Sequence, residues 1–237
     1  MKDLFIADLH LSDNQPEIYH RFKAFLDNKA RNARALYILG DLFEYYLGDD
    51  AKVGVIEQVA HDLDELSEKY QTKCYFMAGN RDFLLGHNFN NSLILLDDSS
   101  LIELDGQKII LTHADALCTD DSDYQKIRQQ LRDSKWQEWF LSQTIPERVE
   151  FAENARIQSQ QHTQSSDSQI MDVNQGAVDD LFSQYNATLM LHGHTHRPGF
   201  HQTQTKNKTR QRMVLGDWHF QNSCIEHFKG NFQLITH

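Results

Sequence analysis

Acidic, amide and imidazole side chains follow five short apolar runs of this sequence, at the point where each run ends. The runs read LFIA, ALYIL, KCYFMA, KIIL and TLML, and the ligand-type residues after them are Asp8, His10, Asp41, Asn80, His113, His194 and His196. Oxygen donors mixed with imidazole, without a thiolate, suit Mn²⁺, Fe²⁺ or Zn²⁺. Seven donors are too many for one tetrahedral ion. They suit two ions about 3.5–4 Å apart that share a carboxylate, an arrangement that favours in-line phosphoryl displacement.

Each of these residues taken alone has a simpler explanation. A single Asp or His at a strand end more often caps or hydrogen-bonds the backbone than binds a metal. Five clusters placed by the same rule are hard to obtain by accident, so we favour the metal site. The other histidines lack this placement, and we expect them at the surface or in the core: His20, His61, His87, His162, His192, His201, His219 and His227.

The elements that must position these clusters follow from the apolar pattern. The five runs are short and rich in β-branched and aromatic residues, as buried strands are. Residues 17–31 and 53–70 carry apolar side chains at helical spacing, so the first half predicts βαβ crossovers, whose ligands bind at the carboxyl ends of the strands. Residues 93–113 and 212–235 resemble closely spaced strands with hairpin turns, and we expect a second sheet there. The predicted fold class is α/β, with two sheets flanked by helices.

Residues 122–161 depart from this alternation, because their composition is helical throughout. Pro146 is placed to begin a new helix. An apolar patch lies within this stretch and comprises Trp136, Trp139, Phe140, Leu141 and Ile145. Two readings stay open: the patch packs onto the core or onto itself, or it belongs to a helical cap that offers an apolar surface to a greasy substrate or a bilayer.

Bulk properties exclude several classes of protein. The chain has 237 residues, 40% hydrophobic and 24% charged, which is ordinary for a globular protein. A formal net charge of −11 argues against a nucleic-acid partner, because binding a polyanion rests on Lys and Arg. Three dispersed cysteines argue against disulfides or a thiolate metal site. No apolar run is long enough for a membrane span and the N-terminus lacks a signal peptide, so we expect a cytoplasmic protein.

The motifs DLH, GD with Glu44, GNRD, TH and GHTH resemble, in order and spacing, the signature of the calcineurin-like metallophosphoesterases. That family has a two-sheet α/β/β/α sandwich. Within it the chain is similar to the pyrophosphohydrolases of the bacterial lipid A pathway, through stretches such as LFIADLHL, GNRDFLLG, LCTDD, IMDVNQ and LHGHTHRP. The resemblance covers nearly the whole chain. It implies one domain over residues 1–237, with residues 122–166 as a helical insertion that caps the active site.

The resemblance also implies a reaction. Water activated between two Mn²⁺ ions would attack the α-phosphorus of UDP-2,3-diacylglucosamine and release UMP and 2,3-diacylglucosamine 1-phosphate. By position, the metal ligands would be Asp8, His10, Asp41, Asn80, His113, His194 and His196. The catalytic group would be Asp41, Asn80, Arg81 and His194. The substrate contacts would be Asn80, Arg81, Asp121, Ser159, Thr163, Ser166 and His194.

Thr163 and Ser166 stand where the best-known relatives have an amide and a lysine, so their contact with the glucosamine or its acyl chains is expected to be weaker or made otherwise. The family further implies peripheral attachment to the cytoplasmic face of the inner membrane. No obligate protein partner is expected.

Arg81 distinguishes this chain from many relatives, which carry His in the GNRD motif. An imidazole can protonate a leaving alkoxide, but a departing sugar phosphate is a far better leaving group, because its second pKa is about 6. A proton donor then gains little, whereas a permanently charged, forked guanidinium can stabilise diphosphate oxygens. Arg81 therefore favours a pyrophosphate substrate. The alternative is that Arg81 only pairs with Asp82.

Two other functions compete with this reading. A general metal-dependent phosphodiesterase or nucleotidase would use the same metal pair on generic diesters. A scaffold that has lost catalysis would show gaps among the metal ligands, and the sequence shows none.

Overall fold

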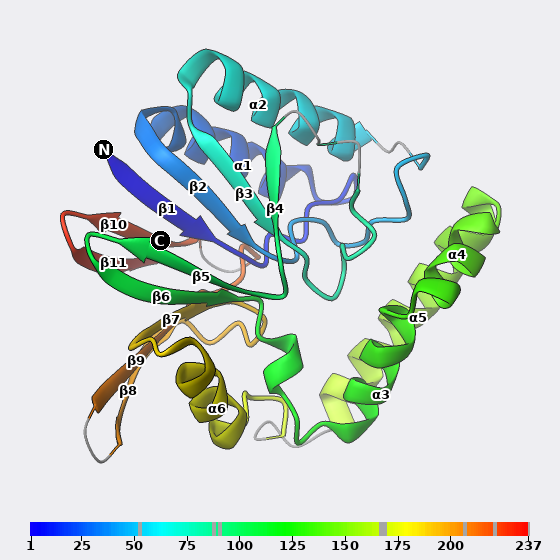
Figure 1. Ribbon diagram of the computed structural model, residues 1–237. Helices are drawn as coiled ribbons and strands as arrows, with labels where there is room; N and C mark the ends of the chain where they lie inside the picture. Colours follow the sequence, from blue (N-terminus) through cyan, green and yellow to red (C-terminus); the bar gives the residue numbers. More distant parts are fainter. Residues whose placement is uncertain are drawn as a thin grey trace.

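Six strands form the first sheet (Figure 1). In spatial order they are β11 (Asn231–Thr236), β10 (Ser223–Phe228), β1 (Lys2–Ile6), β2 (Ala33–Leu39), β3 (Lys73–Met77) and β4 (Leu93–Leu96). Strands β1 to β4 are parallel, β10 pairs antiparallel with β1, and β11 pairs antiparallel with β10. This computed structural model describes residues 1–51, 54–86, 89, 92–165, 170–205, 208–219 and 222–236, and at residues 160 and 162–165 the backbone alone.

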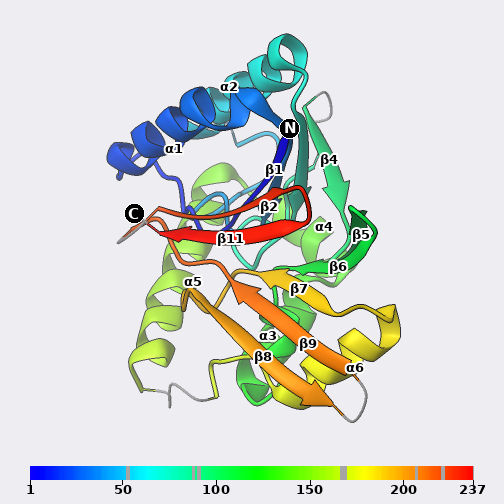
Figure 2. The same ribbon diagram turned by 90° about the vertical axis from the view of Figure 1, so that its left-hand side faces the viewer.

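Five strands form the second sheet, which stacks against the first (Figure 2). In spatial order they are β5 (Ser99–Leu104), β6 (Gln107–Thr112), β7 (Leu189–His192), β9 (Lys208–Val214) and β8 (Gly199–Thr205). Strands β6, β7 and β9 are parallel, and β5 and β8 form antiparallel edges. The carboxyl ends of β6 and β7 therefore point the same way.

The expectation that residues 93–113 and 212–235 all build the second sheet is wrong in part. Strand β4 pairs with β3, and β10 and β11 pair with the open edge of β1, so these three strands belong to the first sheet. The local pattern identifies a strand but not its partner, which is set by contacts distant in sequence. Both predicted hairpin turns are present: Asp105 and Gly106 have φ 48° and 80°, and Lys229 and Gly230 have φ 51° and 77°.

Three helices complete the predicted α/β/β/α sandwich (Figure 1). They are α1 (Pro16–Asn28), α2 (Gly54–Tyr70) and α6 (Gln175–Tyr185). Helices α1 and α2 cover the outer face of the first sheet and α6 that of the second. Successive side chains of a strand face opposite sides, so Leu4 and Ile6 pack against α1 and α2 while Phe5 fills the space between the sheets.

The two predicted helices of the first half are present with nearly the predicted bounds. Helix α1 begins at Pro16, whose fixed φ suits a first turn, and buries Ile18, Phe22 and Leu26 on one stripe. It ends at Asn28, before the predicted residue 31, and residues Ala30–Asn32 continue as a 3₁₀ turn. Helix α2 buries a similar stripe that includes Val55, Val59 and Leu63, so apolar stripes fix both helices against the first sheet.

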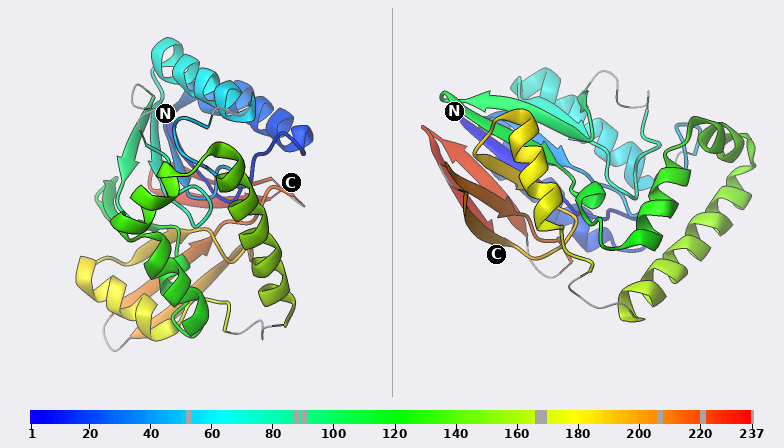
Figure 3. Two further views of the ribbon diagram at one scale, coloured as in Figure 1. Left: turned by 90° about the vertical axis from the view of Figure 1, so that its right-hand side faces the viewer. Right: turned by 60° about the horizontal axis from the view of Figure 1, so that its bottom comes forward.

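Residues 122–165 form three helices set to one side of the sandwich (Figures 1 and 3). They are α3 (Ser122–Leu131), α4 (Ser134–Ser142) and α5 (Ile145–Ser165), and we call them the three-helix segment. The Asp121 carboxylate accepts from Tyr124 N at the start of α3, and the Asp133 carboxylate accepts from Lys135 N and Trp136 N at the start of α4. Both are N-caps that satisfy donors left open by the first turn.

The sequence allowed the apolar patch of this segment either to be packed or to be exposed, and each alternative holds for part of the patch. Phe140 is buried, and the Trp136 ring stacks on it with centroids 5.0 Å apart. Trp139, Leu141 and Ile145 are exposed. Part of the patch is therefore the core of the three-helix segment, and part is an exposed apolar surface.

One buried arginine fastens α5 to the sandwich. Arg148 is buried and donates to the Leu47 carbonyl at 2.6 Å and to Asp50 Oδ1 at 2.7 Å. A buried guanidinium is costly unless it is paired in this way. Within the described part of the chain, no helix is long and apolar enough to cross a membrane.

Candidate metal centre and substrate pocket

The five polar clusters follow β1, β2, β3, β6 and β7 directly, and the parallel strands of each sheet bring them to one edge of the sandwich. Five of the seven predicted metal ligands have left-handed backbone: Asp8 (φ 57°), His10 (53°), Asp41 (52°), His194 (67°) and His196 (53°). That conformation costs roughly 1–2 kcal/mol for a residue with a side chain. Sharp turns at the strand ends thus aim these side chains, and such strain is typical of functional sites.

Two glycines leave room for the carboxylates. A Cβ on Gly79 would lie 2.1 Å from Asp41 Oδ1, and one on Gly193 would lie 2.4 Å from Asp8 Oδ2. No real Cβ approaches an oxygen so closely. The glycines of GNRD and GHTH are therefore required because the backbone passes directly over Asp41 and Asp8.

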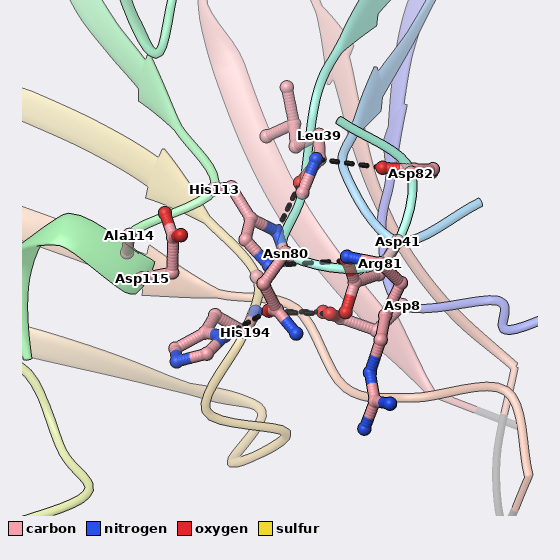
Figure 4. Close-up of polar contacts among 12 residues, drawn as sticks. Asp8, Leu39, Asp41, Asn80, Arg81, Asp82, His113, Ala114, Asp115 and His194 are labelled. Atoms are coloured by element: carbon pink, nitrogen blue, oxygen red, sulfur yellow. Dashed lines mark hydrogen bonds and ion pairs between the residues drawn. The ribbon is translucent and has the colours of Figure 1, made fainter. Parts of the chain in front are cut away.

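Backbone donors hold both carboxylates in place (Figure 4). Asp8 is buried, and its Oδ2 accepts from His194 N at 2.9 Å. Asp41 is buried as well, and its Oδ1 accepts from Arg81 N at 2.9 Å. Two groups of residues could hold a metal ion, Asp8 with His10 and His196 and Asp8 with Asp41 and His113, so the two groups share Asp8.

An oxygen lies behind the Nδ1 atom of three imidazoles, with hydrogen-bond geometry only at His113 among the described residues. His113 Nδ1 lies 2.9 Å from the Leu39 carbonyl, His10 Nδ1 lies 3.4 Å from Glu44 Oε2, and His196 Nδ1 lies 3.6 Å from Asp217 Oδ2.

Their Nε2 atoms face the carboxylates. His196 Nε2 is 3.4 Å from Asp8 Oδ1, His10 Nε2 is 3.9 Å from Asp41 Oδ2, and His113 Nε2 is 3.7 Å from Asp41 Oδ1. An imidazole with an acceptor behind one nitrogen and the other aimed at clustered oxygens has the arrangement of a metal ligand. The donor set therefore fits a divalent cation.

Asn80 connects the remaining histidine to this cluster. Its Oδ1 is 3.1 Å from His113 Nε2 and 3.0 Å from His194 Nδ1. All seven residues predicted as ligands therefore converge in one site.

The electrostatics favour cation binding. Burial alone would raise the pKa of Asp8, but interactions with His196, His113 and His10 lower it to about 2. Burial and the charge of His113 lower the pKa of His194 to about 4, so this imidazole is neutral at neutral pH. Burial opposes protonation of His196, yet Asp8 and Asp217 raise its pKa to about 9. A cation binding there displaces that proton, which makes its affinity depend on pH.

Arg81 does not pair with Asp82 among the described residues. Asp82 is buried and accepts from Gly79 N at 2.8 Å and Leu42 N at 2.7 Å. The Arg81 guanidinium extends the other way (Figure 4), 3.9 Å from Glu44 Oε1. The alternative explanation of Arg81 is thus not supported, and its side chain is 25% exposed.

Two adjoining spaces meet at Arg81. A polar pocket of about 280 Å³ is lined by five of the seven predicted substrate contacts, namely Asn80, Arg81, Asp121, Ser159 and His194. An apolar cavity of about 300 Å³ lies beside it, with Phe83, Ile127, Leu131 and Ala155 in its wall. Asn80, Arg81, Tyr124 and Ser159 line both.

The remaining predicted substrate contacts lie outside the described residues, whereas most of the remaining histidines can be placed. The Thr163 and His162 side chains, together with Ser166 and His87, lie outside the described residues. His20, His61 and His201 are exposed, and His192 and His227 are buried, as expected.

His219, expected at the surface or in the core, is partly buried and its ring stacks on His10 with centroids 5.8 Å apart. The sequence pattern does not identify Asp217, which lies behind His196. The sequence pattern does not identify the apolar cavity either, because its lining comes from segments far apart in the sequence.

Comparisons with known proteins show the family to which this chain is similar. The family model of the calcineurin-like phosphoesterases matches residues 1–198. Proteins from Yersinia pestis bv. Antiqua (strain Angola) and Yersinia pseudotuberculosis serotype O:3 (strain YPIII), each named UDP-2,3-diacylglucosamine hydrolase, are 43% identical over 238 residues, covering 100% of this chain and 99% of theirs. A solved structure of an archaeal phosphodiesterase is 15% identical, with a TM-score of 0.47 and 100% of both chains covered.

Proposed function

We propose, from the premise that this chain belongs to the calcineurin-like phosphoesterase family, that it hydrolyses the pyrophosphate bond of UDP-2,3-diacylglucosamine. The products would be UMP and 2,3-diacylglucosamine 1-phosphate, an intermediate of lipid A biosynthesis. The predicted family and enzyme class are confirmed by the family match and by relatives named UDP-2,3-diacylglucosamine hydrolase at 43% identity over the whole chain.

One observation carries the choice of substrate: Arg81 stands where the polar pocket meets the apolar cavity. A molecule that joins a nucleoside to a diacyl sugar through a diphosphate has a polar part, a doubly anionic centre and apolar chains in that order. The polar part of the substrate matches the polar pocket, the diphosphate matches the Arg81 guanidinium, and the acyl chains match the apolar cavity. A generic phosphodiester would leave the apolar cavity unused.

The family implies a divalent metal, and we propose two Mn²⁺ ions per chain. Asp8, His10 and His196 would hold one ion. Asp8, Asp41 and His113 would hold the other, with Asn80 and His194 completing the set of seven. When bound, such ions supply an activated water and neutralise charge on the phosphate oxygens.

The chain's own residues would position the substrate. The Arg81 guanidinium would donate to the diphosphate oxygens, with Asn80 and His194 beside it, and Asp41 would hold the Arg81 backbone through its 2.9 Å hydrogen bond. The departing sugar phosphate needs no proton donor, which suits an arginine that stays charged.

Further contacts would fix the sugar and its chains. Asp121 and Ser159 line the polar pocket, Ser159 also lines the apolar cavity, and both would hydrogen-bond polar groups of the substrate. Thr163 and Ser166 remain proposed contacts. Residues 122–166 would act as a cap within a single domain of residues 1–237, and Phe83, Ile127 and Leu131 would receive acyl chains.

We further propose a cytoplasmic protein that attaches peripherally to the inner membrane. Trp139, Leu141 and Ile145 are exposed on the three-helix segment and would provide contact with the membrane surface. We propose neither a nucleic-acid partner nor an obligate protein partner.

The test is incubation with UDP-2,3-diacylglucosamine in Mn²⁺ and then in EDTA. UMP should appear in the first case and not in the second. A generic phosphodiester serves as the competing substrate. Turnover of that diester without release of UMP would favour a general phosphodiesterase or nucleotidase.

A further inference from the structure

Glu44 lies at a junction between the metal centre and the three-helix segment. Its carboxylate is buried, and it comes from the loop that follows β2 and Asp41. Oε2 lies 3.4 Å from His10 Nδ1. Oε1 lies 3.0 Å from Arg156 Nε and 3.9 Å from Arg81 Nη1. One carboxylate oxygen is therefore shared by two guanidiniums from different parts of the chain.

Arg156 is the contribution of the three-helix segment to this junction. It lies in α5, whose register is fixed two turns earlier by Arg148 and its bonds to Leu47 and Asp50. The Arg156 side chain is 39% exposed. It borders a small cavity of about 90 Å³ together with Glu44, Asn80 and Arg81. The cavity extends the space around Arg81 toward α5.

The charges of this trio favour an anion. Two guanidiniums face one carboxylate, so one positive charge is left over. Arg81 is only loosely engaged, because its nearest contact with Glu44 is 3.9 Å long and its buried Nε has no hydrogen-bond partner among the described residues. A phosphate can accept from both guanidiniums in the bidentate geometry that a single carboxylate oxygen cannot offer to two.

We propose that Arg156 is a second binding residue for the phosphate on the sugar, and that Glu44 is a positioning residue that holds Arg156 and Arg81 at the spacing of one phosphate group. This inference rests on the proposed function and deepens it. According to this inference, two arginines select a diphosphate over a simple phosphodiester. They are Arg81 from the sandwich and Arg156 from the three-helix segment.

The test measures binding of two lipids to the Mn²⁺-loaded protein, 2,3-diacylglucosamine 1-phosphate and the same lipid without its phosphate. Arg156→Gln should weaken binding of the phosphorylated lipid by about tenfold or more, as expected for a lost charge-assisted hydrogen bond. Binding of the phosphate-free lipid should not change. Arg156→Lys should recover part of the loss, because it restores the charge but not the fork.

Lys126→Gln is the matched control. Lys126 lies on α3, lines none of the described cavities, and its side chain is 75% exposed, so the variant removes one charge from the same segment without touching the junction. It should leave both affinities unchanged. Glu44→Gln should also reduce the preference for the phosphorylated lipid over the phosphate-free lipid. The double variant with Arg156→Gln should lose less affinity for the phosphorylated lipid than the product of the two single losses, because both substitutions disrupt the same group of contacts.

The outcomes separate the two proposals. If the wild type releases UMP and Arg156→Gln keeps the wild-type ratio of affinities, the role of Arg156 is refuted and the proposed function stands. If the wild type releases no UMP and binds both lipids equally, the proposed function fails and this inference fails with it.

Discussion

Gly79→Ala should disable the metal centre while leaving the fold intact. The new Cβ would lie 2.1 Å from Asp41 Oδ1 and 2.4 Å from Asp41 N. The carboxylate cannot turn away freely, because Oδ1 accepts from Arg81 N at 2.9 Å. The backbone of residue 41 cannot yield freely either, because the Asp41 carbonyl accepts from His10 N at 3.0 Å. The substitution therefore displaces Asp41, or the backbone that follows β3.

The magnitudes follow from overpacking and from the geometry of catalysis. Forcing extra volume into a packed site costs about 1–3 kcal/mol, which lowers the melting temperature by roughly 2–12 °C in a chain of this size. A displacement of about 1 Å at a catalytic group can cost about 10²-fold in rate. We therefore expect a modest loss of stability with a loss of activity of about 10²-fold and weaker Mn²⁺ binding.

The assay compares three readouts: melting temperature, Mn²⁺ affinity by calorimetry, and UMP release. Gly106→Ala provides the matched control, because Gly106 has φ 80° and nothing within 4 Å of its added Cβ. That variant should lose about 1–2 kcal/mol of stability from backbone strain and keep full activity. Wild-type metal affinity and activity in Gly79→Ala would refute the packing of Gly79 against Asp41.

Other positions give independent tests. Asp217→Asn should lower Mn²⁺ affinity by about 10–100-fold, as loss of a carboxylate behind a ligating histidine does, and unchanged affinity measured by calorimetry would contradict the role given to Asp217. The hydrogen bond from Arg148 lowers the pKa of Asp50, so the pair stabilises α5 above the ordinary carboxyl pKa of about 4, and this support is lost as pH falls through the lowered value. The hydrogen-exchange protection factors of α5 amides, which correct for slower intrinsic exchange in acid, should therefore fall as pH falls, and Asp50→Asn should remove that pH dependence; an unchanged pH dependence would argue against the anchor. Ile127→Glu should reduce turnover of long-chain substrate by about tenfold or more and spare a soluble UDP-sugar analogue, and equal losses would rule out an acyl site there.

The sequence alone could predict that the seven ligand-type residues converge, because strand topology constrains them so strongly. Once LFIA, ALYIL and KCYFMA are interpreted as parallel strands, their carboxyl ends must meet at one edge, and the residues after them must lie together. The same argument brings in His113 and His194 from the second sheet. The chemistry of each side chain then limits what the group can bind, so few alternatives remain.

The carboxylates behind the histidines could not be predicted in this way. Asp217 follows β9 by three residues and resembles any polar loop residue, yet it reaches His196 because both β7 and β9 end at the same edge. Glu44 belongs to a family motif, but its partner Arg156 is more than a hundred residues away on a helix whose apolar pattern is weak.

The three-helix segment shows why helical patterning carries less information than strand topology here. A strand in a parallel sheet inherits its direction from its neighbours, whereas a helix outside the sandwich is placed by a few contacts between side chains. For α5 these contacts are Arg148 with Asp50, and Arg156 with Glu44. Because the second contact ends at the residue behind His10, the placement of α5 and the geometry of the metal centre depend on each other. If the proposed function and the role proposed for Arg156 hold, a change in α5 is expected to alter phosphate recognition as well as acyl-chain binding.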